Sequence, residues 1–307
     1  MTNAAVVPTY KSGAKSVPAS GVATPEERAA ALTFLQKLAA EVSAGTVDLP
    51  CFPDVVGRIS NALADPSTTS DRLVTIVGAE PRLAARVLQT ANSAAFNSSG
   101  KPLADLRSAV TRLGQQMVQS TAMSYAMQHM KNEASLRSIA QPLAELWNSS
   151  IAVASISKLV ASRTKVRADE AFLTGLLHGI GRLYIMARAA TLANELGGEL
   201  AWMMELIGGW HASIGKAVLQ SWGFDEPMCE AVGDQGDLDR RWKHAATLTD
   251  VLIASMVLAD ALKTPKPHIL GTEGINAFLS IGVTPADCSA ILAQAEEQIR
   301  LVHQALG

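Results

Sequence analysis

The sequence predicts an all-α protein. Apolar residues recur three or four positions apart along most of the chain, and no convincing run alternates apolar and polar residues as a half-buried strand would. Short turns that carry proline or asparagine separate these segments. Helices of this kind bury their apolar faces against one another, so we expect layers of helices and no sheet.

The composition is that of a globular protein with a sizeable core. The chain has 307 residues, of which 48% are hydrophobic and 18% charged, and its formal net charge is −2. This length suggests two domains or one large composite domain. Nucleic acid is not an expected partner, because binding it requires a basic stripe. Two short basic clusters, within 163–167 and 240–243, are interpreted as solvated helix ends.

The cysteines and the apolar runs bear on the compartment. Cys51, Cys229 and Cys288 lie far apart and form no CxxC pair, so neither a zinc ribbon nor a disulfide framework is predicted. The first 20 residues carry no apolar signal sequence. The longest apolar run, 251–259, is far shorter than the roughly 20 residues that span a bilayer. We therefore expect reduced thiols, a cytoplasmic location and no membrane span.

The expected elements follow from start and stop signals along the chain. Residues 1–23 show no periodicity and are expected to form a disordered arm, and a capping box at Thr24 begins a helix that covers 24–45. Short helices separated by prolines should follow as far as residue 131. Longer helices are expected over 136–162, around 172–177, and over 182–207, 210–222, 225–232 and 244–263. A C-terminal helical extension, 264–307, includes a helix capped by Thr284.

Three residues are the main candidates for chemistry. His178 lies in an apolar run directly before Gly179, and its imidazole is either a metal ligand or general base, or a core histidine bonded to a carbonyl. Asp260 lies on the most apolar of the expected helices, one turn beyond Met256 and Val257. If Asp260 is buried, its carboxylate needs a metal, a cation or several hydrogen-bond donors as a partner. If it instead faces a polar surface or a helix end, its role is structural. His211 is the third candidate. The chain contains no GxSxG, Walker A or strand-linked GxGxxG motif.

The N-terminal half carries several motifs in a distinctive order. They are Leu49-Pro50-Cys51-Phe52-Pro53, Asp65-Pro66, Glu80-Pro81-Arg82-Leu83, Asn92-Ser93-Ala94-Ala95-Phe96 and Leu113-Gly114. This series closely resembles the HDOD domain, an HD-related output domain of bacterial signalling proteins. The resemblance runs from about residue 46 to 263, with an N-terminal helical half over 46–131 and an HD-like half over 132–263.

The resemblance implies a bundle of short helices packed on a helical core like that of HD phosphohydrolases. Catalytic members of that superfamily bind metal through a histidine, a His-Asp pair and a distal aspartate. The matching positions here are, in that order, Asn148, His178, Gly179 and Asp260, and His211 matches a histidine frequent in HDOD sequences. Because Asn148 is a weak neutral ligand and Gly179 has no side chain, a hydrolytic metal should bind poorly. The site is expected to be vestigial, with no catalytic residue, metal or cofactor; His178 and Asp260 could hydrogen-bond each other instead.

Three functions remain open. The leading one is a non-catalytic module of bacterial signal transduction, which binds a protein partner or a small signalling ligand through a groove between its two halves. A divergent metal-dependent phosphohydrolase or phosphodiesterase would use His178, His211, Asp260 and Asp234. A nucleotide receptor that does not hydrolyse its ligand would draw phosphate contacts from Arg82, Arg86, Arg163 and Arg182.

Overall fold

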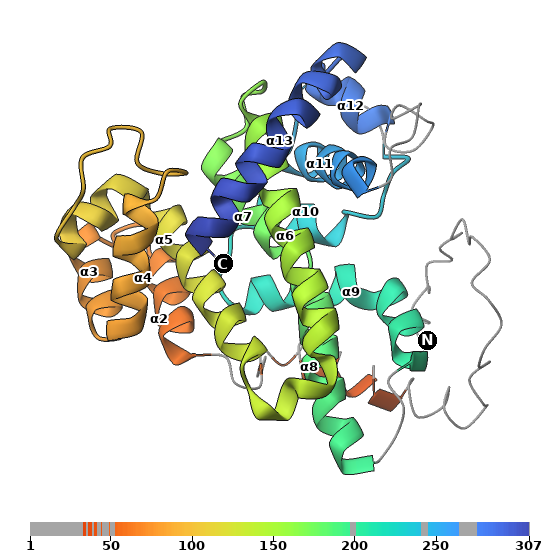
Figure 1. The fold of residues 1–307 in the computed structure, drawn as a ribbon. Helices are drawn as coiled ribbons and strands as arrows, with labels where there is room; N and C mark the ends of the chain where they lie inside the picture. Colours follow the sequence, from red (N-terminus) through yellow and green to blue (C-terminus); the bar gives the residue numbers. More distant parts are fainter. Residues whose placement is uncertain are drawn as a thin grey trace.

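The protein is helical throughout the part of the chain that is described. The computed structural model describes residues 53–196, 201–240, 245–263 and 275–306, together with single positions between 33 and 49. For 192–196, 201–208 and 275 only the backbone is described. No strand occurs within these ranges, which confirms the predicted all-α class (Figure 1). The predicted arm and the motif residues Pro50 and Cys51 lie outside the described residues.

Short helices form a lobe at the N-terminal side of the molecule. They are α2 (Asp54–Leu63), α3 (Ser70–Gly78) and α4 (Pro81–Asn92), which pack with the start of α5 (Leu106–Lys131), at the left in Figure 1. Pro53 occupies the N-cap of α2 and Pro81 begins α4, where a missing backbone N–H is tolerated. The prolines therefore mark helix starts, as the sequence predicts.

The helix α5 departs from the expected pattern of short helices. It spans 26 residues without an intervening loop, but Gly114 within it has φ 73° and ψ 167°. This left-handed φ is accessible to glycine at little steric cost, so the chain kinks there without a loop. Two helices meet directly at Gly114, and the second runs on towards the other half of the molecule.

The second half combines long helices with a few short ones. They are the 3₁₀ turn η1 (Ala134–Ile139), α6 (Ala140–Ala161), α7 (Ala168–Leu177), α8 (Ile180–Leu196), α9 (Ala201–Ser221), α10 (Glu226–Gly233) and α11 (Leu248–Lys263). The predicted boundary between 182–207 and 210–222 is wrong, because α9 runs through Gly208 and Gly209. A glycine inside a helix costs only about 1 kcal/mol, which packing can offset.

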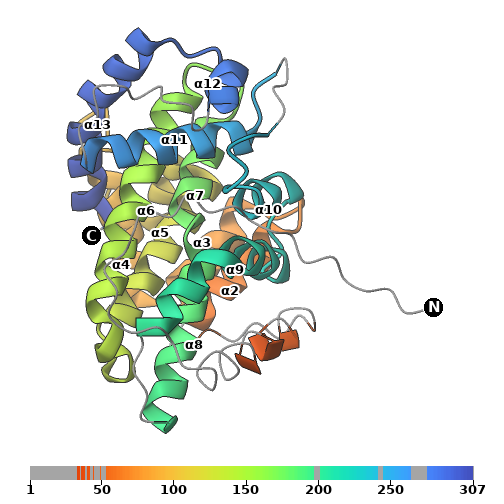
Figure 2. The same cartoon turned by 90° about the vertical axis from the view of Figure 1, so that its right-hand side faces the viewer.

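The C-terminal helices fold back on this core. They are α12 (Ile275–Ile281), which the sequence does not predict, and α13 (Pro285–Leu306). Thr284 and Asp287 exchange capping hydrogen bonds at the start of α13, as expected for a capping box. Figures 1 and 2 show α13 beside α6. At its far end, the carbonyls of Ala305 and Leu306 accept hydrogen bonds from Thr90 of α4 and Ser124 of α5, at 3.3 and 2.5 Å. The helix α13 therefore joins the two halves.

The described part of the predicted N-terminal helix packs against α8. Positions 33, 34, 36–38, 40 and 41 are helical, and Phe34 and Leu38 are buried. Glu41 accepts hydrogen bonds from Arg188, at 2.7 Å, and from the Tyr184 hydroxyl, at 3.2 Å. This half-buried ion pair fixes the helix on the second half of the molecule.

Candidate functional site

His178 lies at the junction between α7 and α8 and is buried, with 7% of its surface exposed. Its Nδ1 lies 2.7 Å from the carbonyl oxygen of Gly175, one turn earlier. A carbonyl only accepts, so Nδ1 carries the proton and Nε2 carries the lone pair in the neutral ring. The structure therefore supports the interpretation of His178 as a histidine bonded to a backbone carbonyl.

Two glycines allow neighbouring helices to come close enough to enclose this histidine. A Cβ on Gly175 would lie 2.7 Å from the Cα of Ala154 in α6, and a Cβ on Gly181 would overlap the carbonyl oxygen of His211 in α9. Real side chains do not tolerate such contacts with backbone atoms. The helix crossings on either side of His178 therefore require glycine, and they exclude water from the imidazole.

The surroundings hold His178 neutral. Burial lowers the pKa of His178 to about 4, although the Gly175 carbonyl opposes this shift. The charges of Arg182, His211 and Lys263 lower the pKa further. The residues of α8, α9 and α11 whose charges lower the pKa of His178 are therefore all basic. One of them is His211, which the sequence also indicates as a candidate for this site.

Gly179 has a hydrophobic neighbour where the HD pair would carry its aspartate. A Cβ at Gly179 would lie 2.5 Å from Cδ1 of Leu146 and 3.8 Å from the hydroxyl of Ser150, both in α6. Leu146 is itself buried. The space beside Gly179 is therefore filled by an aliphatic side chain rather than left open for a carboxylate.

The predicted place of Asn148 at this site is wrong. Asn148 is exposed, and its Oδ1 lies 3.2 Å from Nε2 of His303 in α13. Residues four apart share a face of a helix, so Leu146 and Ser150 face Gly179 while Asn148, midway between them, points elsewhere. The resemblance therefore places Asn148 on the helix that packs beside Gly179, but Asn148 does not lie on the face of that helix that contacts Gly179.

Asp260 is exposed, so of the two alternatives left open by the sequence the structure agrees with a polar position and not with a buried carboxylate. No hydrogen bond joins it to His178, whose bond within the described chain goes to Gly175. The buried carboxylate of α11 is instead Asp250, at 1% exposure. It accepts hydrogen bonds from the backbone and hydroxyl of Thr247, at 2.8 and 2.6 Å, and lies 3.2 Å from Nε of Arg240. The sequence analysis missed this capping box, although Thr247-Leu-Thr-Asp250 has the required spacing.

The residues present do not fit a catalytic metal. Within the described ranges, no three His, Cys, Asp or Glu side chains gather closely enough to hold an ion. Asp234, a possible fourth ligand, is an exposed residue at the end of α10. Its neighbour Gln235 is buried and donates to the carbonyl oxygens of His178 and Val232, at 3.0 and 2.7 Å. Hydrolytic sites usually provide three protein ligands, so we derive no metal-dependent step.

The distinctive motif of the N-terminal half stabilises the loop between α4 and α5. Asn92 accepts a hydrogen bond from the backbone N–H of Leu103 at 2.7 Å and donates to its carbonyl at 2.8 Å. Ser93 donates to the Thr90 carbonyl at 2.7 Å. The side-chain amide of Asn92 thus bonds, through both its oxygen and its nitrogen, to a residue eleven positions later in the chain.

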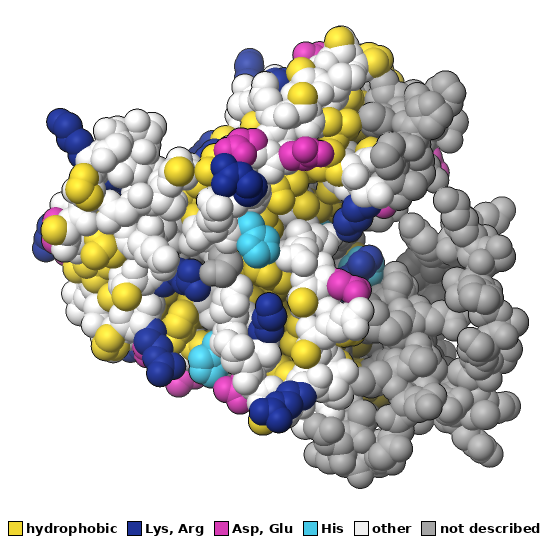
Figure 3. Space-filling model, viewed as in Figure 1, with side chains coloured by type: hydrophobic (Ala, Val, Ile, Leu, Met, Phe, Trp, Pro, Cys, Tyr) yellow, Lys and Arg dark blue, Asp and Glu magenta, His cyan; other side chains and the backbone are white. Residues whose placement is uncertain are grey.

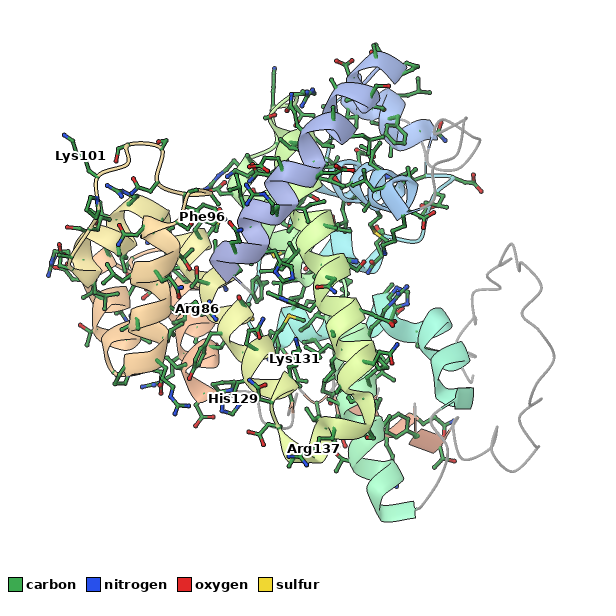
Figure 4. The ribbon with its side chains drawn as sticks, in the orientation of Figure 1. Arg86, Phe96, Lys101, His129, Lys131 and Arg137 are labelled. Carbon is green, nitrogen blue, oxygen red and sulfur yellow. The ribbon has the colours of Figure 1, made fainter. Side chains whose placement is uncertain are left out.

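The same loop connects the two halves through Phe96, which Figure 4 labels. Its ring packs edge-to-face against Phe172 of α7, with centroids 6.2 Å apart. The ammonium of Lys158 in α6 lies 5.1 Å from the ring centre, and burial lowers the pKa of this lysine. The motif Asn92 to Phe96 therefore has a structural role, as do buried Leu49 and the helix-starting Pro53 and Pro81.

A cavity of about 330 Å³ lies between the two halves. Its wall comes from α2 and α5 on one side and from α7, α10 and the turn before α10 on the other. Three glutamines of α5, Gln115, Gln116 and Gln119, contribute much of its polar surface, and Asp225 adds a carboxylate. This volume is at the lower end of the range for sites that bind small molecules. The sequence analysis expected a groove between the halves but named none of these residues.

The predicted phosphate-binding arginines have different surroundings. The charge of Arg82 lowers the pKa of Tyr125, and that of Arg163 lowers the pKa of Asp287 in α13. The charge of Arg182 lowers the pKa of His178. Arg86 lies on the face of α4 that Figure 4 shows, with Lys101, Lys131 and Arg137 elsewhere on the same side. On the described part of this side, basic side chains are interspersed with acidic and apolar ones, without a continuous stripe (Figure 3).

This arrangement defines an all-helical protein of two packed halves, in which no group of three metal-binding side chains gathers among the described residues. The sequence matches the HDOD domain over residues 49–238, which is more than half of the chain. The chain therefore belongs to the HDOD family, as the motifs predict.

Solved structures share this fold. A candidate metal-dependent phosphohydrolase from Shewanella amazonensis is 24% identical, with a TM-score of 0.68, over 91% of this chain and 100% of that one. An HDOD domain protein of unknown function from Geobacter sulfurreducens is 23% identical, with a TM-score of 0.58, over 90% and 98% of the two chains. A candidate signal transduction protein from Marinobacter aquaeolei is 20% identical, with a TM-score of 0.58, over 90% and 65%. No curated protein sequence matches the chain significantly.

Among the described residues, no helix has the length and apolar character needed to cross a membrane. The cysteines there, Cys229 and Cys288, are buried and free, and burial raises the pKa of Cys229 to about 11. A thiol that stays protonated is a poor nucleophile and a poor metal ligand. Neither cysteine therefore adds to the candidate site.

Proposed function

We propose that this protein is a non-catalytic regulatory module of signal transduction, which works in the bacterial cytoplasm. It binds a protein partner or a small signalling ligand in the groove between its two halves. The observation that carries the proposal is Leu146, which fills the space beside Gly179 where a catalytic HD pair carries its aspartate. Membership of the HDOD family supports the signalling role.

We further propose that the functional unit covers residues 46–263, with its halves meeting near residue 131. The match to the family ends at residue 238, within the loop before α11. Arg240 of that loop pairs with the buried Asp250 of α11, which supports counting α11 as part of the unit. A buried ion pair of this kind would be costly to break.

The test is metal content and phosphodiesterase activity of protein purified without a chelator. We expect iron, manganese and zinc well below one equivalent, and no metal-dependent cleavage of bis(p-nitrophenyl) phosphate. Stoichiometric metal together with turnover that His178→Ala abolishes, and that the half-buried His129→Ala retains, would overturn the proposal.

A second candidate function, nucleotide binding without hydrolysis, is favoured by the basic residues around His178. Arg182, Lys263 and His211 all place positive charge near this imidazole. Phosphate is attracted to such a cluster. Calorimetric titration with mono- and cyclic dinucleotides distinguishes this function from protein binding, and heats equal to those of dilution would remove it.

A further inference from the structure

The polar wall of the cavity between the two halves includes the side-chain amides of Gln115 and Gln119. Gln115 donates through Nε2 to the carbonyl oxygen of Thr68 at 3.1 Å, which leaves its side-chain oxygen for the cavity. Gln119, only 6% exposed, donates through Nε2 to the hydroxyl of Ser60 at 3.2 Å. Within the described chain, the side-chain oxygen of Gln119 accepts no hydrogen bond. Because Gln119 lines the cavity, its amide oxygen can accept a hydrogen bond from a ligand or from water there.

The lining of the cavity includes one acidic residue, Asp225, and Glu170 lies next to it outside the lining. Asp225 occupies the N-cap of α10, but its side chain makes no capping hydrogen bond. Glu170, in the first turn of α7, is half-buried, and its pKa is raised by burial and then by the nearby Asp225 carboxylate. These two carboxylates therefore face each other across the boundary between α7 and α10.

The nearest cation is already engaged. Arg167 donates to Asp169 at 2.8 Å and to the side-chain oxygen of Gln116 at 3.1 Å. Asp169 and Arg167 thus largely compensate each other, while Glu170 and Asp225 have no ion-pair partner among the described residues. The carboxylates of Glu170 and Asp225 therefore leave negative charge beside the cavity. Negative charge there disfavours a phosphate ligand and favours a cation.

The rest of the wall suits an aliphatic stem. Leu173 and Met228 are buried, and Phe224 is half-buried beside them in the lining. Gly223, with φ 74°, makes the turn that brings Phe224 and Asp225 to the cavity. An inorganic cation would leave this apolar surface unused, and no group of three acidic or metal-binding side chains exists among the described residues.

We propose that the cavity binds a small organic cation with an ammonium or guanidinium group. Its charge lies beside Asp225, whose neighbour is Glu170, its N–H groups donate to the oxygens of Gln115 and Gln119, and its aliphatic stem packs on Phe224 and Met228. The inference rests on the proposed role of this groove as the ligand-binding site, and it adds the chemical class of the ligand.

The experiment is calorimetric titration of the full chain with putrescine, agmatine and spermidine. Butane-1,4-diol is the neutral control of matched length, glutarate the anionic one, and calcium and magnesium chloride the inorganic ones. We expect saturable binding of at least one amine and none of the controls. Asp225→Asn should weaken that binding roughly tenfold, because a charge-assisted hydrogen bond is lost.

Two further variants make the result specific. Gln119→Leu keeps the size of the side chain but removes the acceptor, so it should also weaken binding several-fold. Glu145→Gln removes an exposed carboxylate that does not line the cavity, and it should bind as the parent does. Circular dichroism of each variant checks that it is folded.

The inference is overturned if no amine binds at millimolar concentration, or if Glu145→Gln weakens binding as much as Asp225→Asn. Equal binding of the diol would remove the charge requirement and would also overturn it. If amines fail while metal-dependent hydrolysis is absent, only the ligand class is wrong. Hydrolysis abolished by His178→Ala would instead overturn the proposed function, whatever the amines do.

Discussion

At the scale of single residues, His178 and the side chain of Leu146 beside Gly179 belong to the core. His178 donates to the Gly175 carbonyl, and Leu146 lies against Gly179. A neutral imidazole and an aliphatic side chain stabilise the junction of α7 and α8 without any ion. His178 and Leu146 are tested separately, because His178 can take up a proton whereas Leu146 contributes only the volume of its side chain.

His178 should make stability depend on pH. In the unfolded chain the imidazole takes up a proton below about pH 6.5, whereas in the folded chain it does so only near pH 4. Its contribution is therefore fully present above pH 6.5, and it is lost as the pH falls from 6.5 to 4. The loss should be about 3 kcal/mol in the free energy of unfolding.

Urea unfolding of the parent and of His178→Asn between pH 4 and 7.5 measures this effect. The asparagine can still donate to the Gly175 carbonyl but does not titrate, so the stability difference between the two proteins should shrink as the pH falls. Carboxylates shared by both proteins cancel in that difference. A difference that is constant across the range would contradict the prediction.

Gly179 should tolerate a side chain only when Leu146 is made smaller. Gly179→Asp places a Cβ within 2.5 Å of the Leu146 side chain, so it should destabilise the fold by about 1–3 kcal/mol. Leu146→Ala leaves a cavity of its own, but the double variant should be more stable than the sum of the single effects by roughly 1 kcal/mol. A double-mutant cycle in urea measures the coupling, and strict additivity would show that the two positions do not compete for space.

At the scale of elements, the loop from α4 to α5 is ordered by one side chain. Asn92 bonds both backbone groups of Leu103, and the loop presents Phe96 to α6 and α7. The most distinctive motif of the family resemblance thus has a structural role here, because it holds this loop in place. Its loss should loosen the contact between the halves.

Asn92→Ala should lower the free energy of unfolding by about 1–3 kcal/mol, because two partly buried backbone groups lose their partners. The matched control is Asn97→Ala in the same loop, where the bond to the Lys101 carbonyl is exposed, and its effect should stay within about 0.5 kcal/mol. Chemical denaturation of both variants tests this, and equal losses would argue against this structural role of Asn92.

At the scale of the whole molecule, the two halves are connected in several places. The end of α13 bonds to Thr90 and Ser124, Phe96 reaches Phe172, and the cavity lies at the same boundary. A ligand in that cavity would contact residues from both halves at once. Such a site is well placed to alter how the halves pack, which is a plausible basis for regulation.

Local signals were sufficient for most helices. Periodicity and the proline starts at Pro53 and Pro81 predicted the elements, and Thr284 predicted the start of α13. The helices α8 and α9 were divided wrongly, because Gly208 and Gly209 resemble a stop signal and only packing shows that the helix continues. The kink at Gly114 has the same origin, since a glycine is compatible with a turn, a kink or a helix.

The sequence by itself determined the all-α class, the family and the central position of His178, because periodicity, motif order and an isolated polar group in an apolar run are local properties. Only the tertiary structure decided which residues meet there. In the folded chain, Asn148 and Asp260 are exposed and Asp250 is buried. Leu146 is the side chain that lies beside Gly179. The physical reason is that the face of a helix that becomes buried depends on the helices packed against it. A shift of one or two residues in that packing separates a motif from its site.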